Sequence, residues 1–465
     1  MKRLLLPALL LTTLTACTAA PAGTLPAAAP SPTPASIPAP TAAPALADAL
    51  TPEEKIGQLF IIRPDALDLT LPQESINDAK ADGVTMLTDA MRETLQAYPV
   101  GGICQFGKNI TDPEQLAQFN ADLQAASRTP LFIAVDEEGG AVARLANHPA
   151  FDLPQYESAA AVGASGDPAD ACAMGQTIGA YLKEYGFNMD FAPDADVNTN
   201  PDNPIIGTRA FSSDAATAAE MAAAAADGLR TSGILPTLKH FPGHGDTAED
   251  SHTALAVTYK TLDELQACEL LPFAADTGLH AVMVGHIAAP NVTGDGTPAT
   301  LSPQLVALIP DAENTLIVTD SLAMDAITAA YTPGEAAVQA FQAGCDVLLM
   351  PNSLPEAYAA VLEAVQNGTI SEERLDRSVN KILLYKQQFA SSGGQSSGRR
   401  QPRRNKRGTL CPTPSGPLTA RFLPSAFRAS SAIPSSCSPR WTASSRRALS
   451  KLSPRRALKR RTIPI

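Results

Sequence analysis

Eight short apolar segments, spaced through residues 51–389, constrain the fold of this chain more than any other feature of its sequence. Each has the length and aliphatic character of a buried strand; they are 57–62, 99–104, 131–136, 188–193, 235–240, 281–286, 315–320 and 345–350. The stretches between them carry helix-start signals, in which a capping side chain precedes a proline or a glutamate. These signals are Thr51-Pro52, Asp112-Pro113, Asp167-Pro168, Thr332-Pro333 and Ser371-Glu372. Strands that alternate with helices in this way predict a parallel sheet covered by helices.

The number of strands and the positions of the reactive side chains favour a barrel. Eight strand–helix repeats within residues 50–390 fit an α/β fold of the (β/α)8 TIM type, which takes about 250 residues and is often enlarged by loops. A doubly wound open sheet is the alternative. Five reactive side chains stand at the C-terminal ends of the expected strands, where such barrels gather catalytic groups: Asp136, Lys239, His240, His286 and Asp320.

The first 46 residues predict export and a tether. Residues 1–17 begin with Lys2-Arg3 and continue as an apolar run, which is the plan of a signal peptide. Their last four, Leu-Thr-Ala-Cys, resemble a bacterial lipobox, which implies lipidation of Cys17; an ordinary signal peptide with an incidental Cys17 is the alternative. Residues 18–46 are almost wholly Ala, Pro, Thr and Ser, as in a flexible linker. We expect an exported lipoprotein, anchored by Cys17 to the outer face of the bacterial cell membrane.

The charge of the chain is divided unevenly along its length. The formal net charge is -12, yet residues 391–465 contain 17 Lys or Arg and no Asp or Glu. The part before this tail is therefore strongly acidic, which argues against a nucleic-acid partner because phosphate binding needs clustered positive charge. The tail itself has the composition of a disordered segment, and its lack of acidic residues fits a shifted reading frame equally well.

The densest group of proton-transfer side chains lies at residues 239–252, KHFPGHGDTAEDSH. His240, His244 and His252 could be read as metal ligands. Pro242, Gly243 and Gly245 prevent a helix that would place two of the histidines on one face, so the usual zinc spacing is absent. The seven cysteines also show no paired spacing. We therefore expect no metal and no cofactor.

Asp320 ends the apolar segment 316–320, LIVTD. A lone aspartate after a strand is often only a helix N-cap. Together with a proton donor from 239–252, however, it supplies the two groups that glycoside cleavage requires, one to attack the anomeric carbon and one to protonate the leaving oxygen.

Several spaced motifs resemble glycoside hydrolase family 3, in its β-N-acetylhexosaminidase branch. They are VDEEGGAVAR at 135–144, NPIIGTRAF at 203–211, KHFPGHGDT at 239–247, DSH at 250–252 and VTDSLAMDAI at 318–327. The resemblance runs from about residue 51 to about residue 389. It implies that Asp320 is the covalent nucleophile, that His252 is the acid/base and that Asp250 orients His252. It also implies a set of sugar-binding residues: Asp136, Arg144, Arg209, Lys239 and His240.

These implied roles agree with the chemistry of the side chains. Imidazole titrates near neutrality, so His252 can protonate a departing oxygen and then deprotonate water. The resemblance therefore predicts a retaining exo-β-N-acetylglucosaminidase acting on terminal β-linked N-acetylglucosamine, with peptidoglycan fragments as the expected substrates. A β-glucosidase of the same family is one alternative, and a surface sugar-binding lipoprotein without activity is another.

Overall fold

The computed structural model describes residues 46–249, 254–276 and 278–389. Eight strands form one sheet in the order β11-β9-β7-β6-β3-β2-β1-β12, and all neighbouring pairs are parallel. Their bounds are β1 Phe60–Ile62, β2 Gly102–Cys104, β3 Phe132–Val135, β6 Met189–Asp190, β7 Leu235–Phe241, β9 Ala281–Val284, β11 Leu316–Thr319 and β12 Leu348–Leu349. A parallel bridge between Val318 and Val347, with Thr319 N donating to Val347 O at 2.9 Å, joins the two ends of the sheet. The result is a (β/α)8 barrel, as predicted, and each of the eight expected strands is present.

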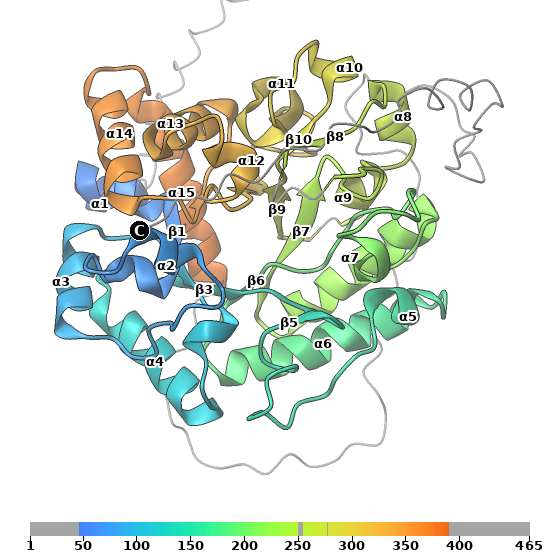
Figure 1. The fold of residues 1–465 in the computed structure, drawn as a ribbon, viewed down its shortest axis with the longest axis horizontal. Helices are drawn as coiled ribbons and strands as arrows, with labels where there is room; N and C mark the ends of the chain where they lie inside the picture. The colour runs from blue at the N-terminus through green and yellow to red at the C-terminus, as the bar shows by residue number, and fades with distance from the viewer. Residues whose placement is uncertain (1–45, 250–253, 277, 390–465) are drawn as a thin grey trace, which may run out of the picture. The chain divides into compact units, whose positions relative to one another are not determined.

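Helices surround the strands (Figure 1). The α-helices are α1 Pro52–Gln58, α2 Gln73–Asn77, α3 Asp89–Ala97, α4 Pro113–Ala126, α5 Ala159–Gly163, α6 Pro168–Glu184, α7 Ala215–Thr231, α8 Leu262–Ala267, α9 Leu271–Ala275, α10 Pro290–Thr293, α11 Pro303–Val306, α12 Asp325–Thr328, α13 Pro333–Ala343, α14 Leu354–Gln366 and α15 Glu372–Phe389. Short 3₁₀ segments are η1 Leu46–Ala49, η2 Pro64–Leu67, η3 Gly107–Asn109, η4 Gly207–Arg209 and η5 Ala299–Leu301. In the described residues, no helix combines the length and the apolar character needed to cross a membrane.

The expected helix starts are confirmed by their capping contacts. Thr51 and Thr332 each form a capping box with a glutamate three residues later, and the proline after each cap is the first residue of its helix. Asp112 and Asp167 cap α4 and α6 by accepting backbone N–H groups. The helix after Ser371 begins at Glu372.

Two small elements at the C-terminal ends of the strands shape the site. The hairpin of β4 (Glu137–Gly139) and β5 (Val142–Ala143) follows β3 directly. Its turn uses Gly139 and Gly140, whose φ angles of 84° and 63° favour glycine. The second element pairs β8 (Ala256–Val257) in parallel with β10 (Ile287–Ala288), so the chain that follows β7 is held against the chain that follows β9.

The helices beneath the hairpin approach each other closely. A Cβ atom on Gly175 of α6 would lie 2.2 Å from Ala225 O of α7, and one on Gly228 of α7 would lie 2.2 Å from Cys172 O. Both distances are too short for a real side chain, so glycine is required for this helix contact. Residues of both helices, among them Met174 and Leu229, line an apolar pocket that Glu138 and Arg209 also line.

Candidate active site

Asp320 follows β11 at the C-terminal rim of the barrel. Its N–H donates to Val284 O at 2.9 Å, which continues the pairing of β11 with β9, and its half-buried carboxylate accepts the Ser321 N–H at Oδ1 at 2.7 Å. The next helix, α12, begins only at Asp325 and has Met324 at its N-cap position. Asp320 is therefore not a helix cap, and that reading of the sequence is wrong.

Lys239 is the centre of a buried charge cluster. It lies on β7, and its Nζ is 2.8 Å from Asp136 Oδ1 and 2.7 Å from Glu138 Oε1. Arg144 Nη2 approaches the other Asp136 oxygen at 3.3 Å. Burial acts to raise the pKa of Asp136, but Lys239 and Arg144 outweigh it and hold this pKa below its ordinary value. Asp136 is therefore an ionised hydrogen-bond acceptor at the rim.

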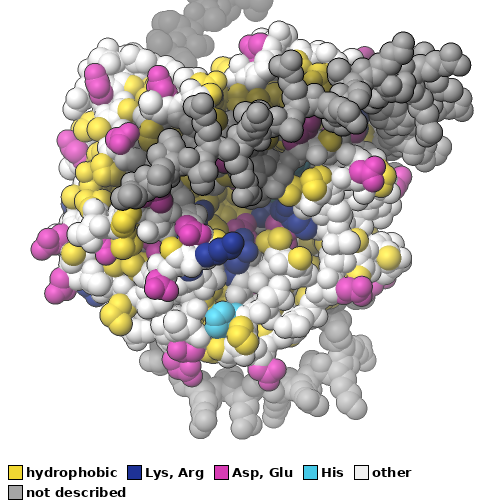
Figure 2. All heavy atoms as spheres, in the orientation of Figure 1, with side chains coloured by type: hydrophobic (Ala, Val, Ile, Leu, Met, Phe, Trp, Pro, Cys, Tyr) yellow, Lys and Arg dark blue, Asp and Glu magenta, His cyan; other side chains and the backbone are white. Residues whose placement is uncertain are grey.

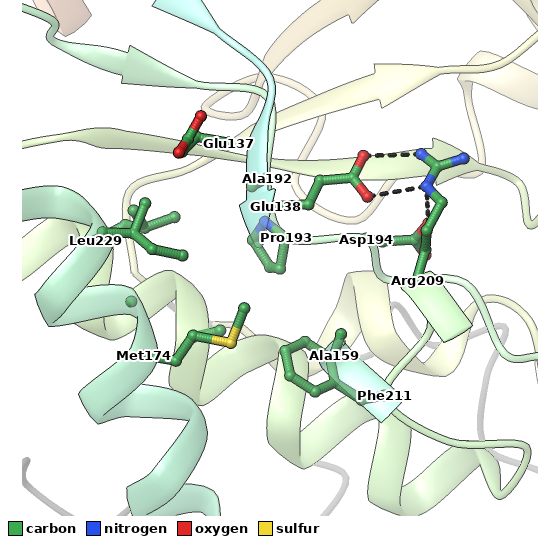
Figure 3. A pocket seen from close by; sticks show the side chains of 13 residues that line it. Glu137, Glu138, Ala159, Met174, Ala192, Pro193, Asp194, Arg209, Phe211 and Leu229 are labelled. Atoms are coloured by element: carbon green, nitrogen blue, oxygen red, sulfur yellow. Dashed lines mark hydrogen bonds and ion pairs between the residues drawn. The ribbon is translucent and has the colours of Figure 1, made fainter. Parts of the chain in front are cut away.

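Arg209, on η4, forms a second charge pair beside the first. Its Nε and Nη2 atoms each donate to one oxygen of Glu138 at 2.8 Å, and Nε lies 3.5 Å from Asp194 Oδ2. Figure 3 shows Glu138 facing the guanidinium, with apolar side chains such as Met174 and Phe211 nearby. A two-point contact of this kind fixes the plane of the guanidinium as well as its position.

His240 is paired with a buried carboxylate. Its Nδ1 lies 2.7 Å from Asp196 Oδ2, and its Nε2 lies 3.3 Å from Arg209 Nη2. A guanidinium can only donate, so Nε2 is the acceptor in this geometry and the ring proton is on Nδ1. Burial acts to lower the pKa of His240, but the Asp196 charge raises it overall. Asp196 therefore determines both the tautomer and the orientation of the imidazole.

The same region brings together three groups with potential metal-ligand atoms. One ligand atom each from Asp194, Asp196 and His240 lies within 4.8 Å of the others. This set differs from the three histidines that the sequence suggested. Asp196 already accepts from His240, and the permanent charge of Arg209 lies 3.5 Å from Asp194 Oδ2, where it would repel a divalent cation. We therefore retain the expectation that catalysis needs no metal.

The structure thus brings together five of the residues that sequence reasoning assigned to sugar binding, namely Asp136, Arg144, Arg209, Lys239 and His240. Asp250, His252 and Cys17 lie outside the described residues. Among the described residues on either side of Asp250 and His252, Lys260 Nζ lies 3.2 Å from Asp246 Oδ1.

Three carboxylates in the cluster, Glu138, Asp194 and Asp196, were not predicted from the sequence. Glu138 could have been found from the sequence, because the side chains of successive residues in a strand point to opposite faces. Glu138 and its neighbour Glu137 on β4 should therefore have different surroundings. Glu137 instead accepts the backbone N–H groups of residues 144–146 at 2.6–2.9 Å. Asp194 and Asp196 follow β6 at the same rim, and burial together with the Asp196 charge raises the pKa of Asp194 to about 7.

Replacing Glu138 should destabilise the protein in a pH-dependent way. Glu138→Gln removes the negative charge that pairs with Arg209 and Lys239. We expect this loss to lower the unfolding free energy at pH 7 by about 3 kcal/mol or more. Burial opposes ionisation of Glu138, but Arg209 and Lys239 lower its pKa from 4.5 to about 2. Its stabilising contribution is therefore complete above about pH 4.5 and is lost as the pH falls towards 2. Urea unfolding of both proteins across this range should show the difference shrinking in acid; a constant difference would contradict the assignment.

Comparison with known families agrees with this arrangement. The family model described as the glycosyl hydrolase family 3 N-terminal domain matches residues 51–384, which is nearly the whole barrel. The chain belongs to glycosyl hydrolase family 3. The expected family is therefore confirmed, and the motifs that suggested it all lie within the matched residues.

The chain is similar to several bacterial proteins of this family. Beta-hexosaminidase A of Pseudoalteromonas piscicida is 33% identical over 341 residues, which cover 66% of this chain and 57% of that protein. Beta-hexosaminidase LpqI of Mycobacterium tuberculosis is 32% identical over 366 residues, 72% of this chain and 83% of that protein. The solved family 3 β-N-acetylglucosaminidase of Paenibacillus sp. str. FPU-7 superposes with a TM-score of 0.67 at 37% identity, covering 76% of this chain and 65% of that one. The chain thus spans less than two thirds of the first of these relatives.

Proposed function

We propose that the protein is a retaining exo-β-N-acetylglucosaminidase that removes terminal β-linked N-acetylglucosamine through a covalent intermediate on Asp320. One observation carries the proposal: a strand-end carboxylate stands at the same barrel rim as a buried, charge-paired set of donors and acceptors. The names of the relatives, beta-hexosaminidase and β-N-acetylglucosaminidase, support the same activity.

The proposed reaction follows from the roles that these side chains can play. The Asp320 carboxylate attacks the anomeric carbon as the bond to the leaving oxygen breaks, and the acid, which we assign to His252 oriented by Asp250, gives that oxygen its proton. Water, deprotonated by the same histidine, then displaces Asp320 and restores the β configuration. The charge cluster holds the sugar: ionised Asp136 accepts hydrogen bonds from hydroxyls, and Lys239 and Arg209 donate.

The test is hydrolysis of a chromogenic β-N-acetylglucosaminide beside the matching β-glucoside. We expect turnover of the first and little of the second. Preference for the glucoside would favour a glucosidase, and binding without turnover of either would favour a sugar-binding protein that lacks activity.

A further part of the proposal concerns an acidic aglycone, such as the lactyl carboxylate of a peptidoglycan fragment. Arg63 and Arg144 flank Phe106 at the rim, with their guanidinium carbons 4.1 Å and 5.6 Å from the ring centroid. Within the described residues, the buried Nε atoms of both arginines lack a hydrogen-bond partner. Figure 2 shows Lys and Arg side chains gathered near the centre of one face. Two cationic side chains beside each other at the rim suit a carboxylate.

Removing one of these arginines should therefore affect charged and neutral substrates differently. Arg63→Ala should raise KM for an N-acetylglucosaminyl-muramic acid fragment by about 10-fold, the equivalent of one charge-assisted hydrogen bond. The neutral chromogenic substrate should keep its KM within about 2-fold. Steady-state kinetics on both substrates checks this, with Arg92→Ala, a change on α3, as the matched control. Equal losses on the two substrates would remove the support for an acidic aglycone.

We also propose that the enzyme acts outside the cytoplasmic membrane as a lipoprotein, on the strength of the lipobox-like residues 14–17. Cys17→Ser should release the protein from the membrane fraction or leave an uncleaved precursor, because the thiol is the acylation point. Fractionation and intact-mass measurement report both results. A processed Cys17→Ser protein that stays in the membrane fraction would exclude this anchor.

A further inference from the structure

His286 stands at the end of an expected strand but has no role in the mechanism described above. It lies two residues after β9, which pairs with β11 in register from Ala281 opposite Leu316 to Val284 opposite Thr319. His286 therefore lies alongside the residues that follow β11, the first of which is Asp320. Its side chain is completely buried, so it is not exposed to a substrate.

The two ring nitrogens of His286 each contact a fixed partner. Nε2 lies 2.8 Å from the backbone oxygen of Ser321, and Nδ1 lies 2.8 Å from Thr300 Oγ1. A carbonyl oxygen can only accept, so Nε2 carries a proton and donates to Ser321. Thr300 Oγ1 also lies 3.1 Å and 3.0 Å from Val284 O and Gly285 O, which anchors it to the end of β9.

Ser321 connects this histidine to the proposed nucleophile. Its backbone oxygen accepts from His286, while its backbone N–H donates to Asp320 Oδ1 at 2.7 Å. The direction of that N–H depends on the backbone torsions of Ser321, which the His286 contact restrains. The chain of contacts thus runs from the end of β9 through Thr300, His286 and Ser321 to the carboxylate.

We propose that His286 is a positioning residue for Asp320: by donating to the Ser321 carbonyl, it keeps the Ser321 N–H on Asp320 Oδ1 and so fixes the carboxylate for attack. The inference rests on the proposed function, in which Asp320 is the nucleophile. An error of about 1 Å in the position of a reacting group can lower its rate about 100-fold, so the contact matters even though His286 does not touch the substrate.

Two substitutions separate the role of Nε2 from the bulk of the ring. In His286→Gln the amide nitrogen can reach the position of Nε2 and still donate to Ser321. In His286→Asn the shorter amide can reach Thr300 but not Ser321. We expect His286→Asn to lower kcat about 10- to 100-fold with little change in KM, and His286→Gln to stay within about 5-fold of the wild type.

The decisive measurement is the rate of covalent labelling by a 5-fluoro-N-acetylglucosaminyl fluoride, followed by intact mass. In this step the bond from Asp320 to the anomeric carbon forms, and fluoride departs with the electron pair of the C–F bond, so the acid contributes little. The labelling rate should fall in His286→Asn and be largely retained in His286→Gln. Thr300→Val, which removes the hydroxyl that anchors the ring, should lower it in the same direction and serves if His286→Asn does not fold.

A second buried histidine, at the other end of β9, provides the matched control. His280 immediately precedes β9 at its opposite end, and its Nδ1 lies 2.8 Å from Gly278 O. His280→Asn should lower the melting temperature without changing the labelling rate. Equal labelling by His286→Asn and His286→Gln, or normal labelling by His286→Asn, would overturn the positioning role. Failure of the wild-type protein to become labelled on Asp320 would instead overturn the proposed function.

Discussion

Asp320→Gly should reduce kcat/KM for aryl β-N-acetylglucosaminides by about 10⁴-fold or more, the scale seen when the nucleophile of a covalent mechanism is removed. The loss should be similar for good and poor leaving groups, because the group that attacks the anomeric carbon is missing in every case. Rates measured across a series of substituted phenols check this. Asp325→Ala is the control, since Asp325 is an exposed aspartate five residues further along the same segment and should retain near-normal turnover.

Azide gives this variant a specific chemical signature. With the Asp320 carboxylate removed, azide can occupy the vacated space and attack the intact substrate from the face opposite the leaving group. The product should be the α-glycosyl azide, identified by NMR. Near-normal turnover of Asp320→Gly, or a β-azide product, would show that another group is the nucleophile.

The fold was predictable because its signals are local. Each strand is a short apolar run, and each major helix start, such as Thr51-Pro52 or Thr332-Pro333, is a capping signal contained within four residues. The order of strands in a barrel then follows from their alternation with helices. These features depend little on contacts between distant parts of the chain.

The charge cluster was only partly predictable because its pairs are distant in sequence. Asp136 and Lys239 are 103 residues apart, and Glu138 and Arg209 are 71 residues apart. The sequence motifs indicated which cations to assign to sugar binding but not which carboxylates pair with them. Three of those carboxylates are nearly or completely buried, where their cost is offset only by partners that the fold supplies. Their identity therefore became clear only in three dimensions.

For His286, the position in the sequence suggested a reactive role that the structure does not support. Its place at the end of an apolar strand resembled that of a reactive group, yet the ring is buried and both nitrogens contact protein atoms. The rule that catalytic groups gather at the C-terminal rim selects a region only. For His286, the two protein contacts of its ring nitrogens then indicate a supporting role.

His252→Ala should have the second largest effect, and it should depend on the leaving group, unlike that of Asp320→Gly. Loss of a general acid typically costs about 10²–10⁴-fold, so a substrate with a poor leaving group should lose this much. One with an acidic phenol should still form the glycosyl-enzyme quickly, because its oxygen needs little protonation. His148→Ala, which changes a histidine on the loop after β5, should leave both rates near normal.

The second step should then become limiting in His252→Ala, because water has lost its base. A rapid burst of phenol followed by slow turnover is the expected time course, with the glycosyl-enzyme detectable by intact mass. Azide needs no base, so it should capture this intermediate from the face opposite Asp320 and give the β-glycosyl azide. Opposite azide anomers from the two variants would separate nucleophile from acid/base within one site, whereas the same anomer from both would mean that the two roles have been assigned incorrectly.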